Sequence, residues 1–100
     1  MAETSPRTRA IVTAETRPAM PPHIKLRHDA GRGRWLILAP ERVFEPDAIA
    51  VEVLKLCDGQ RAVADIAAVL AKEYNAPKEE ITVDVITMLQ DLADKGVVKA

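Results

Sequence analysis

Few side chains in this sequence could act as a nucleophile. Nucleophilic catalysis needs a cysteine or serine beside a base, and the only candidates are Cys57 and Ser5. Ser5 lies in an N-terminal stretch with no helical or strand period. Cys57 follows Leu56 in the last turn of a predicted amphipathic helix, where a buried and inert thiol is expected.

The sequence also offers no convincing metal ligands and no convincing acid-base residues. His23 and His28 are five residues apart on a predicted strand, so they point to opposite faces and cannot chelate one metal ion together. The acidic pair Glu79-Glu80 is typical of the solvated first turn of a helix, where negative charge interacts favourably with the helix dipole. The single cysteine excludes both an internal disulfide and a cysteine-based zinc site. We therefore expect a non-enzymatic protein with no cofactor and no metal.

Length and composition indicate one small soluble domain. The chain has 100 residues, of which 48% are hydrophobic and 29% charged, as in globular proteins. Its longest apolar runs have six residues, far short of the roughly 20 that span a bilayer. The N-terminus lacks the apolar region of a secretory signal, and one unpaired cysteine suits a reducing compartment. We expect a cytoplasmic protein without membrane contact.

The chain divides into a tail and a domain. Residues 1–22 are rich in Thr, Ala, Arg and Pro and have no regular period, which predicts a disordered N-terminal tail or linker. The folded domain is expected to span residues 23–100. Period-two alternation and turn residues predict three strands at its start: Ile24–Arg27, Trp35–Leu38 and Arg42–Glu45.

Helical periodicity replaces the strand pattern after Pro46. Asp47 is a predicted N-cap, and Gly59 and Gly96 are predicted helix stops. The expected helices run from Asp47 to Asp58, from Ala62 to Tyr74 and from Lys78 to Lys95, the second burying Ile66, Val69 and Leu70. This order predicts an α+β, winged helix-turn-helix-like fold, with a three-stranded antiparallel sheet followed by a three-helix bundle.

A winged-helix fold suggests DNA binding, but the charge of the third predicted helix argues against that function. The third predicted helix would enter the major groove, but it carries five acids against two lysines and would be repelled by the phosphates. Residues 1–44 carry eight bases and four acids, whereas residues 45–100 carry six bases and eleven acids. We expect no nucleic-acid partner, although the basic strands and tail keep a winged-helix DNA-binding regulator open as the alternative.

The third helix has an unusually wide apolar stripe. Its apolar residues cover roughly 160° of the helix, where one packed face typically covers about 100° or somewhat more. The helix is either wedged between two neighbours, or it packs the core with one edge and lines a groove with the other. In the second case the third strand forms the opposite wall, and a peptide could add to it as a further strand.

Several strings carry a family resemblance over about residues 17–98. They are Arg17-Pro18, Pro21-Pro22-His23, Arg32-Gly33-Arg34-Trp35, Leu38-Ala39-Pro40-Glu41-Arg42, Leu56-Cys57-Asp58-Gly59 and Leu89-Gln90-Asp91-Leu92. In this order and spacing the chain resembles the D proteins of pyrroloquinoline quinone (PQQ) biosynthesis. That resemblance implies a peptide chaperone with a winged helix-turn-helix-like fold, similar to the recognition elements of ribosomally made, post-translationally modified peptides (RiPPs).

The resemblance also implies partners and a site. Such a protein binds the PQQ precursor peptide and presents it to a radical SAM enzyme, which cross-links a Glu and a Tyr. Some relatives are fused to the oxidase of the pathway, and the Pro-rich tail would then correspond to a linker. The implied peptide site lies between the third strand and the third helix: Arg42, Val43, Phe44, Val85, Met88, Leu89 and Leu92. We expect a charge at Val85 or Leu89 to abolish peptide binding and to leave the fold intact.

Two further expectations concern single positions. Ala62 stands where the family often has Ser or Thr, and the missing cap would cost roughly 0.5–2 kcal/mol. Trp35 is expected to pack within the sheet rather than to bind a ligand. Four arginines of the strand region either form an ordinary solvated face or meet an acidic partner: Arg27, Arg32, Arg34 and Arg42.

Overall fold

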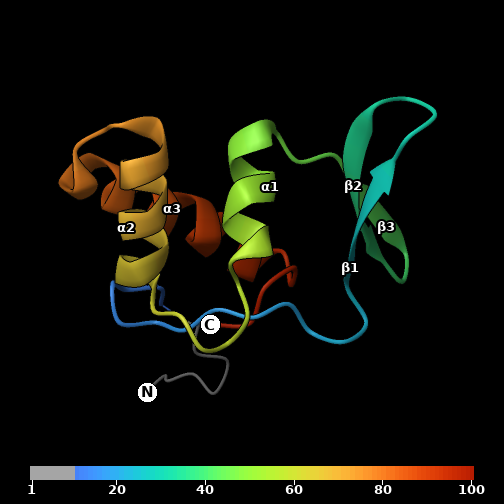
Figure 1. The fold of residues 1–100 in the computed structure, drawn as a ribbon. Coiled ribbons are helices and arrows are strands. Elements are labelled where there is room, and N and C mark those ends of the chain that lie inside the picture. Colours follow the sequence, from blue (N-terminus) through green and yellow to red (C-terminus); the bar gives the residue numbers. More distant parts are fainter. Residues whose placement is uncertain (1–10) are drawn as a thin grey trace, which may run out of the picture.

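The fold has two parts, a small sheet and a group of three helices. The structure is a computed structural model that describes residues 11–100, and the first ten residues of the predicted tail lie outside the described residues. Three strands precede three helices, and Figure 1 shows all helices on one side of the sheet, with α1 nearest to it. The elements are β1 (Lys25–Asp29), β2 (Arg34–Ala39), β3 (Arg42–Phe44), α1 (Ala48–Lys55), α2 (Val63–Tyr74) and α3 (Lys78–Asp94). The predicted α+β order is confirmed.

The sheet is antiparallel with the strand order β1-β2-β3. Its register places Leu26 opposite Ile37 and Ile37 opposite Phe44. These three side chains share the face that turns to the helices, because alternate residues of a strand point the same way. Ile37 is fully buried there, with Leu26 and Phe44 packed against the same core.

Trp35 packs within the sheet region, as expected. Its ring lies 4.9 Å from the ring of His28 on the neighbouring strand, measured between centroids. The ammonium group of Lys55, from α1, lies 4.8 Å from the centre of the Trp35 ring. The indole therefore joins the sheet to α1 through a ring contact and a cation–π contact.

The helices begin and end close to the predicted residues. Asp47 caps α1, its carboxylate accepting a hydrogen bond from the Ala50 N–H at 2.8 Å. Gly59 and Gly96 have φ values of 79° and 80°, the left-handed conformation that suits glycine after a helix. One residue of α2 differs from expectation: Val69 is 44% exposed, so the predicted burial of this side chain is wrong.

One aliphatic core joins the sheet to the helices. Its buried members come from every region of the described chain, including the C-terminal end. They are Val12, Ile24, Ile37, Val53, Leu54, Cys57, Val63, Ile66, Leu70, Val85, Leu89, Leu92, Val97 and Val98. None of the helices within residues 11–100 is long and apolar enough to cross a membrane.

Residues 11–22, here called the N-terminal arm, pack against the helices. Val12 is only 4% exposed, and its N–H donates to the side-chain oxygen of Gln90 on α3 at 2.9 Å. Ala19 exchanges two backbone hydrogen bonds with Lys99, of 3.1 and 2.7 Å. The packed unit therefore begins before the predicted boundary at His23. Sequence periodicity missed the arm because its backbone, and not a repeating set of side chains, makes most of these contacts.

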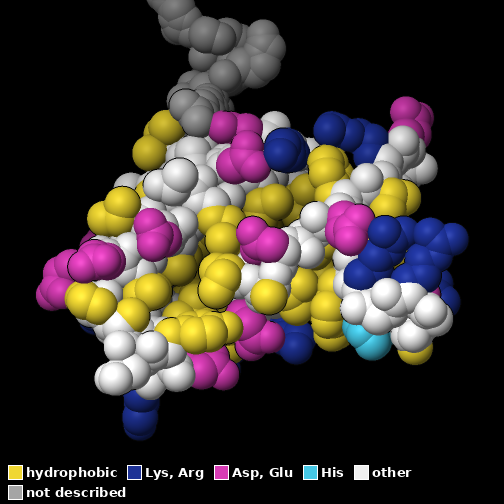
Figure 2. All heavy atoms as spheres, turned by 90° about the horizontal axis from the view of Figure 1, so that it is seen from above, with side chains coloured by type: hydrophobic (Ala, Val, Ile, Leu, Met, Phe, Trp, Pro, Cys, Tyr) yellow, Lys and Arg dark blue, Asp and Glu magenta, His cyan; other side chains and the backbone are white. Residues whose placement is uncertain are grey.

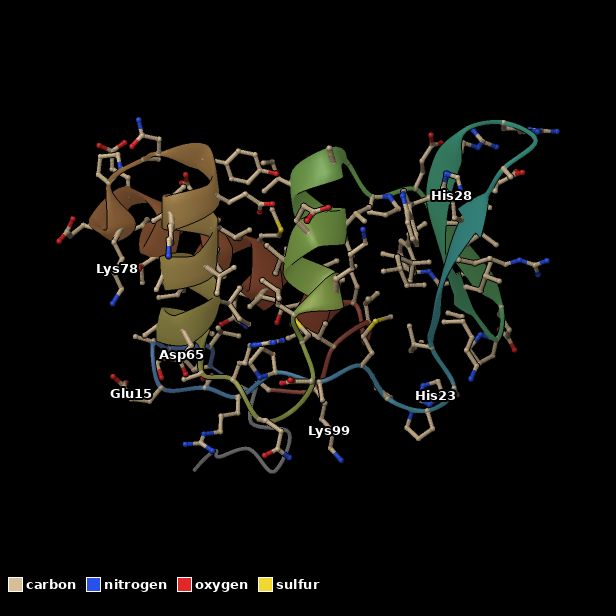
Figure 3. All side chains as sticks on the ribbon, viewed as in Figure 1. Glu15, His23, His28, Asp65, Lys78 and Lys99 are labelled. Carbon is tan, nitrogen blue, oxygen red and sulfur yellow. The ribbon has the colours of Figure 1, made fainter. Side chains whose placement is uncertain are left out.

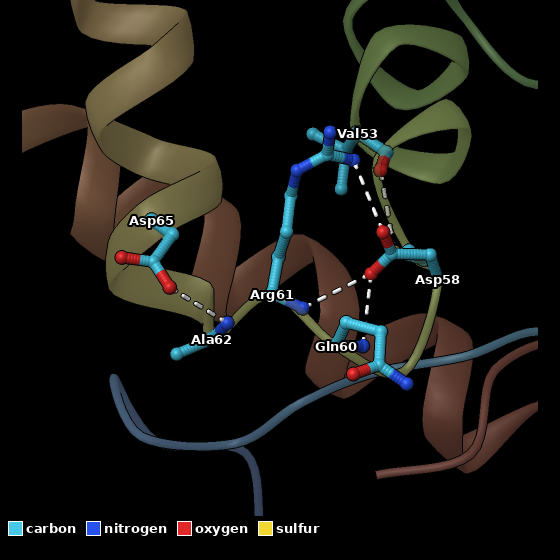
Figure 4. Close-up of polar contacts among 7 residues, drawn as sticks. Val53, Asp58, Gln60, Arg61, Ala62 and Asp65 are labelled. Carbon is cyan, nitrogen blue, oxygen red and sulfur yellow. Dashed lines mark hydrogen bonds and ion pairs between the residues drawn. The ribbon is translucent and has the colours of Figure 1, made fainter.

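The arm also caps α2. Ala62 offers no side-chain acceptor at the N-cap, but the Val63 and Ala64 N–H groups donate to the carbonyls of Thr16 and Ala14, at 2.8 and 2.9 Å. The Asp65 carboxylate accepts from the Ala62 N–H at 3.1 Å (Figure 4). The helix thus satisfies its first N–H groups without the serine or threonine that the family resemblance suggested.

Candidate functional site

β3 is an edge strand and forms the first half of the predicted site. It pairs with β2 alone, and its other edge has no strand partner among residues 11–100. Such an edge presents backbone N–H and C=O groups to which another extended chain can bind. The three residues of this strand are the predicted site residues Arg42, Val43 and Phe44.

The side chains of β3 point to both faces of the sheet. Val43 is 64% exposed and lies on the face turned away from the helices, since it pairs with Leu38 and not with Ile37. Phe44 faces the helices and packs against the core. The Arg42 guanidinium lies 4.6 Å from the centre of the Phe44 ring, so a cation covers the outer part of this apolar side chain.

Three of the four predicted residues on α3 are core residues. Val85, Leu89 and Leu92 are 2%, 0% and 8% exposed, and only Met88 is partly open. The expectation that a charge at Val85 or Leu89 leaves the fold intact is therefore wrong. A charge there would enter a water-free interior without a partner, which is strongly unfavourable.

The two edges of the α3 stripe meet different surroundings. One edge is covered by the N-terminal arm, which reaches Gln90 through the Val12 N–H. The opposite edge, with Ile81 and Met88, borders an apolar pocket of about 120 Å³. The arm is therefore one neighbour of the stripe, as the first reading expects. The pocket at the opposite edge is lined from α1 and α2 and by no residue of β3, so a groove with the third strand as its wall stays a prediction. The pocket is lined by Ile49, Leu70, Tyr74, Ile81, Asp84, Val85 and Met88.

Two lining residues of this pocket were not foreseen from the sequence. Ile49 of α1 and Tyr74 of α2 are 42% and 46% exposed. The sequence places Ile49 only within the first predicted helix, and Tyr74 at the end of the second. No local pattern brings these two positions next to α3, because their proximity depends on how three helices pack.

Charge differs between the two sides of this region. Figure 2 shows hydrophobic side chains across the middle of the molecule seen from above, with acidic side chains among them on the helical side and basic side chains gathered over the sheet. Phe44, Met88 and the buried residues of α3 all pack in or against one core cluster. Phe44 and the four predicted residues of α3 thus belong to or pack against one core cluster, whereas Arg42 and Val43 are exposed on the edge strand.

Cys57 has the properties of a structural thiol. It is buried, and its Sγ donates to the Val53 carbonyl at 3.2 Å. Burial, with a smaller contribution from the adjacent Asp58 carboxylate, raises the pKa of this thiol to about 12. The thiolate needed for nucleophilic attack is therefore scarce at neutral pH.

No metal site stands out in the described part of the chain. Residues 11–100 contain no group of three or more His, Cys, Asp or Glu side chains that could hold a metal ion. His23 precedes β1 and so lies outside the strand that was predicted to carry both histidines. Figure 3 shows it below the start of β1, well apart from His28 on the sheet.

Asp58 organises the turn between α1 and α2. Its carboxylate accepts hydrogen bonds from the Gln60 and Arg61 N–H groups, at 2.9 and 3.0 Å, and pairs with the Arg61 guanidinium at 3.3 Å (Figure 4). The two backbone hydrogen bonds are the main reason why the pKa of Asp58 is lowered, and Arg61 contributes. The Leu56-Cys57-Asp58-Gly59 string thus shapes a helix-to-helix turn and is not a binding site of its own.

Comparison with known families identifies the group to which this architecture belongs. The family model for coenzyme PQQ synthesis protein D (PqqD) matches residues 34–98, a segment that contains β2, β3 and all three helices. The chain belongs to the PqqD family. PqqD-family relatives include a PqqA binding protein of Bradyrhizobium diazoefficiens, 59% identical over 85 residues, which are 85% of this chain and 82% of the relative.

Solved PqqD structures share the fold. The solution NMR structure of the PqqD truncation of Methylobacterium extorquens PqqCD, described as a functional and stand-alone RiPP recognition element, is 39% identical with a TM-score of 0.77. The similarity covers 92% of this chain and 97% of that one. The crystal structure of PqqD from Xanthomonas campestris is 38% identical with a TM-score of 0.57, over 89% of this chain and 99% of that one.

Proposed function

We propose that this PqqD-family protein binds the PQQ precursor peptide and presents it to a radical SAM enzyme for Glu-Tyr cross-linking. The protein itself carries out no chemistry in this role. The observation that supports it most is the open edge of β3, whose Phe44 packs against the same core cluster as the apolar side chains of α3. Relatives named PqqA binding proteins support the identity of the ligand. Because ribosomes make the precursor, we expect the protein to act in the cytoplasm.

We infer that the peptide adds to the sheet as a fourth strand. Its backbone would pair with β3 at Arg42, Val43 and Phe44, which is the mode known as β-augmentation. Alternate peptide side chains would then turn toward the helices, where Phe44 and Met88 are partly accessible. Val85, Leu89 and Leu92 hold this surface in place from beneath, as the buried floor of the site.

A titration of isotope-labelled protein with the precursor peptide tests the proposal. We expect the backbone amide shifts to change at residues 40–45 and around Met88. Saturable changes confined to another region would overturn the proposed groove, and no change with peptide and enzyme both present would overturn the function.

A pair of variants on α3 sharpens this test. Met88→Asp places a charge on the partly open edge of the helix, and Val83→Asp places the same charge at a position that is 62% exposed. We expect peptide affinity to fall for the first variant and to remain near the wild-type value for the second. Equal affinities for the two folded variants would contradict a site at Met88.

DNA binding remains the alternative to be tested. The basic side chains gather over the sheet, and α3 opens with Glu79 and Glu80, which would be repelled by phosphates. A winged-helix regulator would bind a duplex with an affinity that falls steeply with salt. We expect no binding to duplex DNA at about 50 mM salt, a concentration that favours such contacts.

A further inference from the structure

β2 is apolar on both of its faces. Trp35, Ile37 and Ala39 alternate with Leu36 and Leu38 along the strand. An antiparallel sheet with one solvated face usually alternates apolar and polar residues, whereas continuous apolar runs are typical of strands covered on both faces. Figure 1 places all three helices on one side of this sheet. The sequence of β2 therefore suits a sheet whose second face is also covered.

The second face carries a compact apolar strip. We call it the outer sheet face and define it by Lys25, Arg27, Leu36, Leu38 and Val43. The register places Leu38 between Lys25 and Val43, and Leu36 beside Arg27. An open hollow of about 450 Å³ lies at one end of this face, lined in part by Arg27, Leu36 and Leu38.

The charges of this face favour an acidic partner. Lys25 and Arg27 form no ion pair with any of residues 11–100, whereas Arg34 is bound to Glu45 at 3.1 Å. Asp29 is the carboxylate at the far end of the same face. Two copies of the chain joined by a two-fold axis at the middle of β1 would bring the two Arg27 side chains together, which is unfavourable. A partner with carboxylates around an apolar centre avoids this repulsion.

We propose that the outer sheet face is the docking surface for a second protein, whose contact region is apolar and bordered by carboxylates. This inference rests on the proposed function, under which that protein is the peptide-modifying enzyme. A peptide strand added to β3 would place every second side chain on this same face, next to Val43. The partner then contacts the sheet and the bound peptide together, so each ligand strengthens binding of the other.

The test compares variants of the whole chain for affinity to the purified radical SAM enzyme. Lys25→Glu combined with Arg27→Glu reverses the charge of the face, and Leu36→Gln interrupts the apolar strip. Matched controls are Lys72→Glu on α2 and Val83→Gln on α3, both exposed positions outside the face. Thermal unfolding and peptide affinity are measured for every variant, so that a loss of fold is recognised.

We expect the outer-face variants to bind the enzyme about tenfold or more weakly, and to bind the peptide within about twofold of wild type. Both controls should bind the enzyme as wild type does. Addition of the peptide should tighten wild-type binding to the enzyme.

Three results would overturn the docking surface. Folded outer-face variants with wild-type enzyme affinity would place the enzyme elsewhere and leave the peptide function standing. Sedimentation showing that wild type self-associates, and that the variants do not, would identify a second copy as the occupant. A loss of peptide affinity in the same variants would assign the face to the peptide. Failure of the wild-type protein to bind the peptide, by contrast, would overturn the proposed function.

Discussion

The packing of the N-terminal arm makes a strong prediction about two adjacent residues. Val12 is 4% exposed and belongs to the core, whereas Ile11 is 62% exposed. If the arm packs as described, Val12→Ala lowers the free energy of unfolding and Ile11→Ala has almost no effect. If residues 11–22 were a tail without contacts, neither substitution would change stability.

The magnitude follows from the atoms that are removed. Val12→Ala deletes two buried methyl-sized groups, each worth about 0.8 kcal/mol, so we expect a loss of about 1.6 kcal/mol before any cavity effect. A domain of this size loses roughly 4–8 °C in Tm for each kcal/mol. The expected decrease in Tm is therefore about 6–13 °C. Ile11→Ala removes a mostly solvated side chain and should stay within about 0.5 kcal/mol of wild type.

Urea and thermal unfolding, followed by circular dichroism, measure both variants under the same conditions. The slope of the unfolding free energy against urea should be similar for the three proteins, so that the midpoints can be compared directly. Equal midpoints for wild type and Val12→Ala would refute the packing of the arm. A loss at Ile11 as large as that at Val12 would show that the arm packs in another register.

Three further expectations concern the core and two titrating groups. Leu89→Asp should unfold the protein or destabilise it by about 3 kcal/mol or more. Met88→Asp should keep a cooperative unfolding transition. A stable Leu89→Asp protein would contradict the packing of α3. The Cys57 thiol, with its pKa raised from 9.0 to about 12, should react with a thiol reagent at pH 8 only after unfolding. Because the unfolded thiol ionises first, stability should decline between about pH 9 and 12, and Cys57→Ala should remove that part of the decline. The pKa of Asp58 is lowered in the folded protein, so its ionised carboxylate stabilises the fold at pH values above the ordinary pKa of an aspartate. This contribution is lost as the pH falls from that ordinary pKa through the lowered one. Asp58→Ala should therefore make the unfolding free energy depend less on pH in the acid range.

The strands and helices could be predicted because their side chains repeat with the period of the backbone. Ile24 and Leu26 alternate with Lys25 and Arg27, the apolar run of the Arg34–Ala39 strand lies between turn residues, and Asp47, Gly59 and Gly96 act locally at helix ends. Such signals need no knowledge of the tertiary structure. The arm has no equivalent signal, since carbonyl groups of Ala14 and Thr16 do the capping, and every residue type has a carbonyl.

The candidate site was predictable only in part, for a related reason. Periodicity gives the angular width of the apolar stripe on α3, but not which neighbour covers each edge. Leu89 lies near the middle of the stripe and is fully buried, whereas Met88 lies at its open edge. Ile49 and Tyr74 join the same pocket from two other helices, an association that only the packed structure reveals.

The pairing of Ala19 with Lys99 has a practical consequence for protein engineering. It brings the N-terminal arm and the last residues side by side on the lower side of the molecule in Figure 1, away from the face viewed in Figure 2. A reporter domain or an affinity tag attached after Ala100 would therefore start from the side opposite the face viewed in Figure 2.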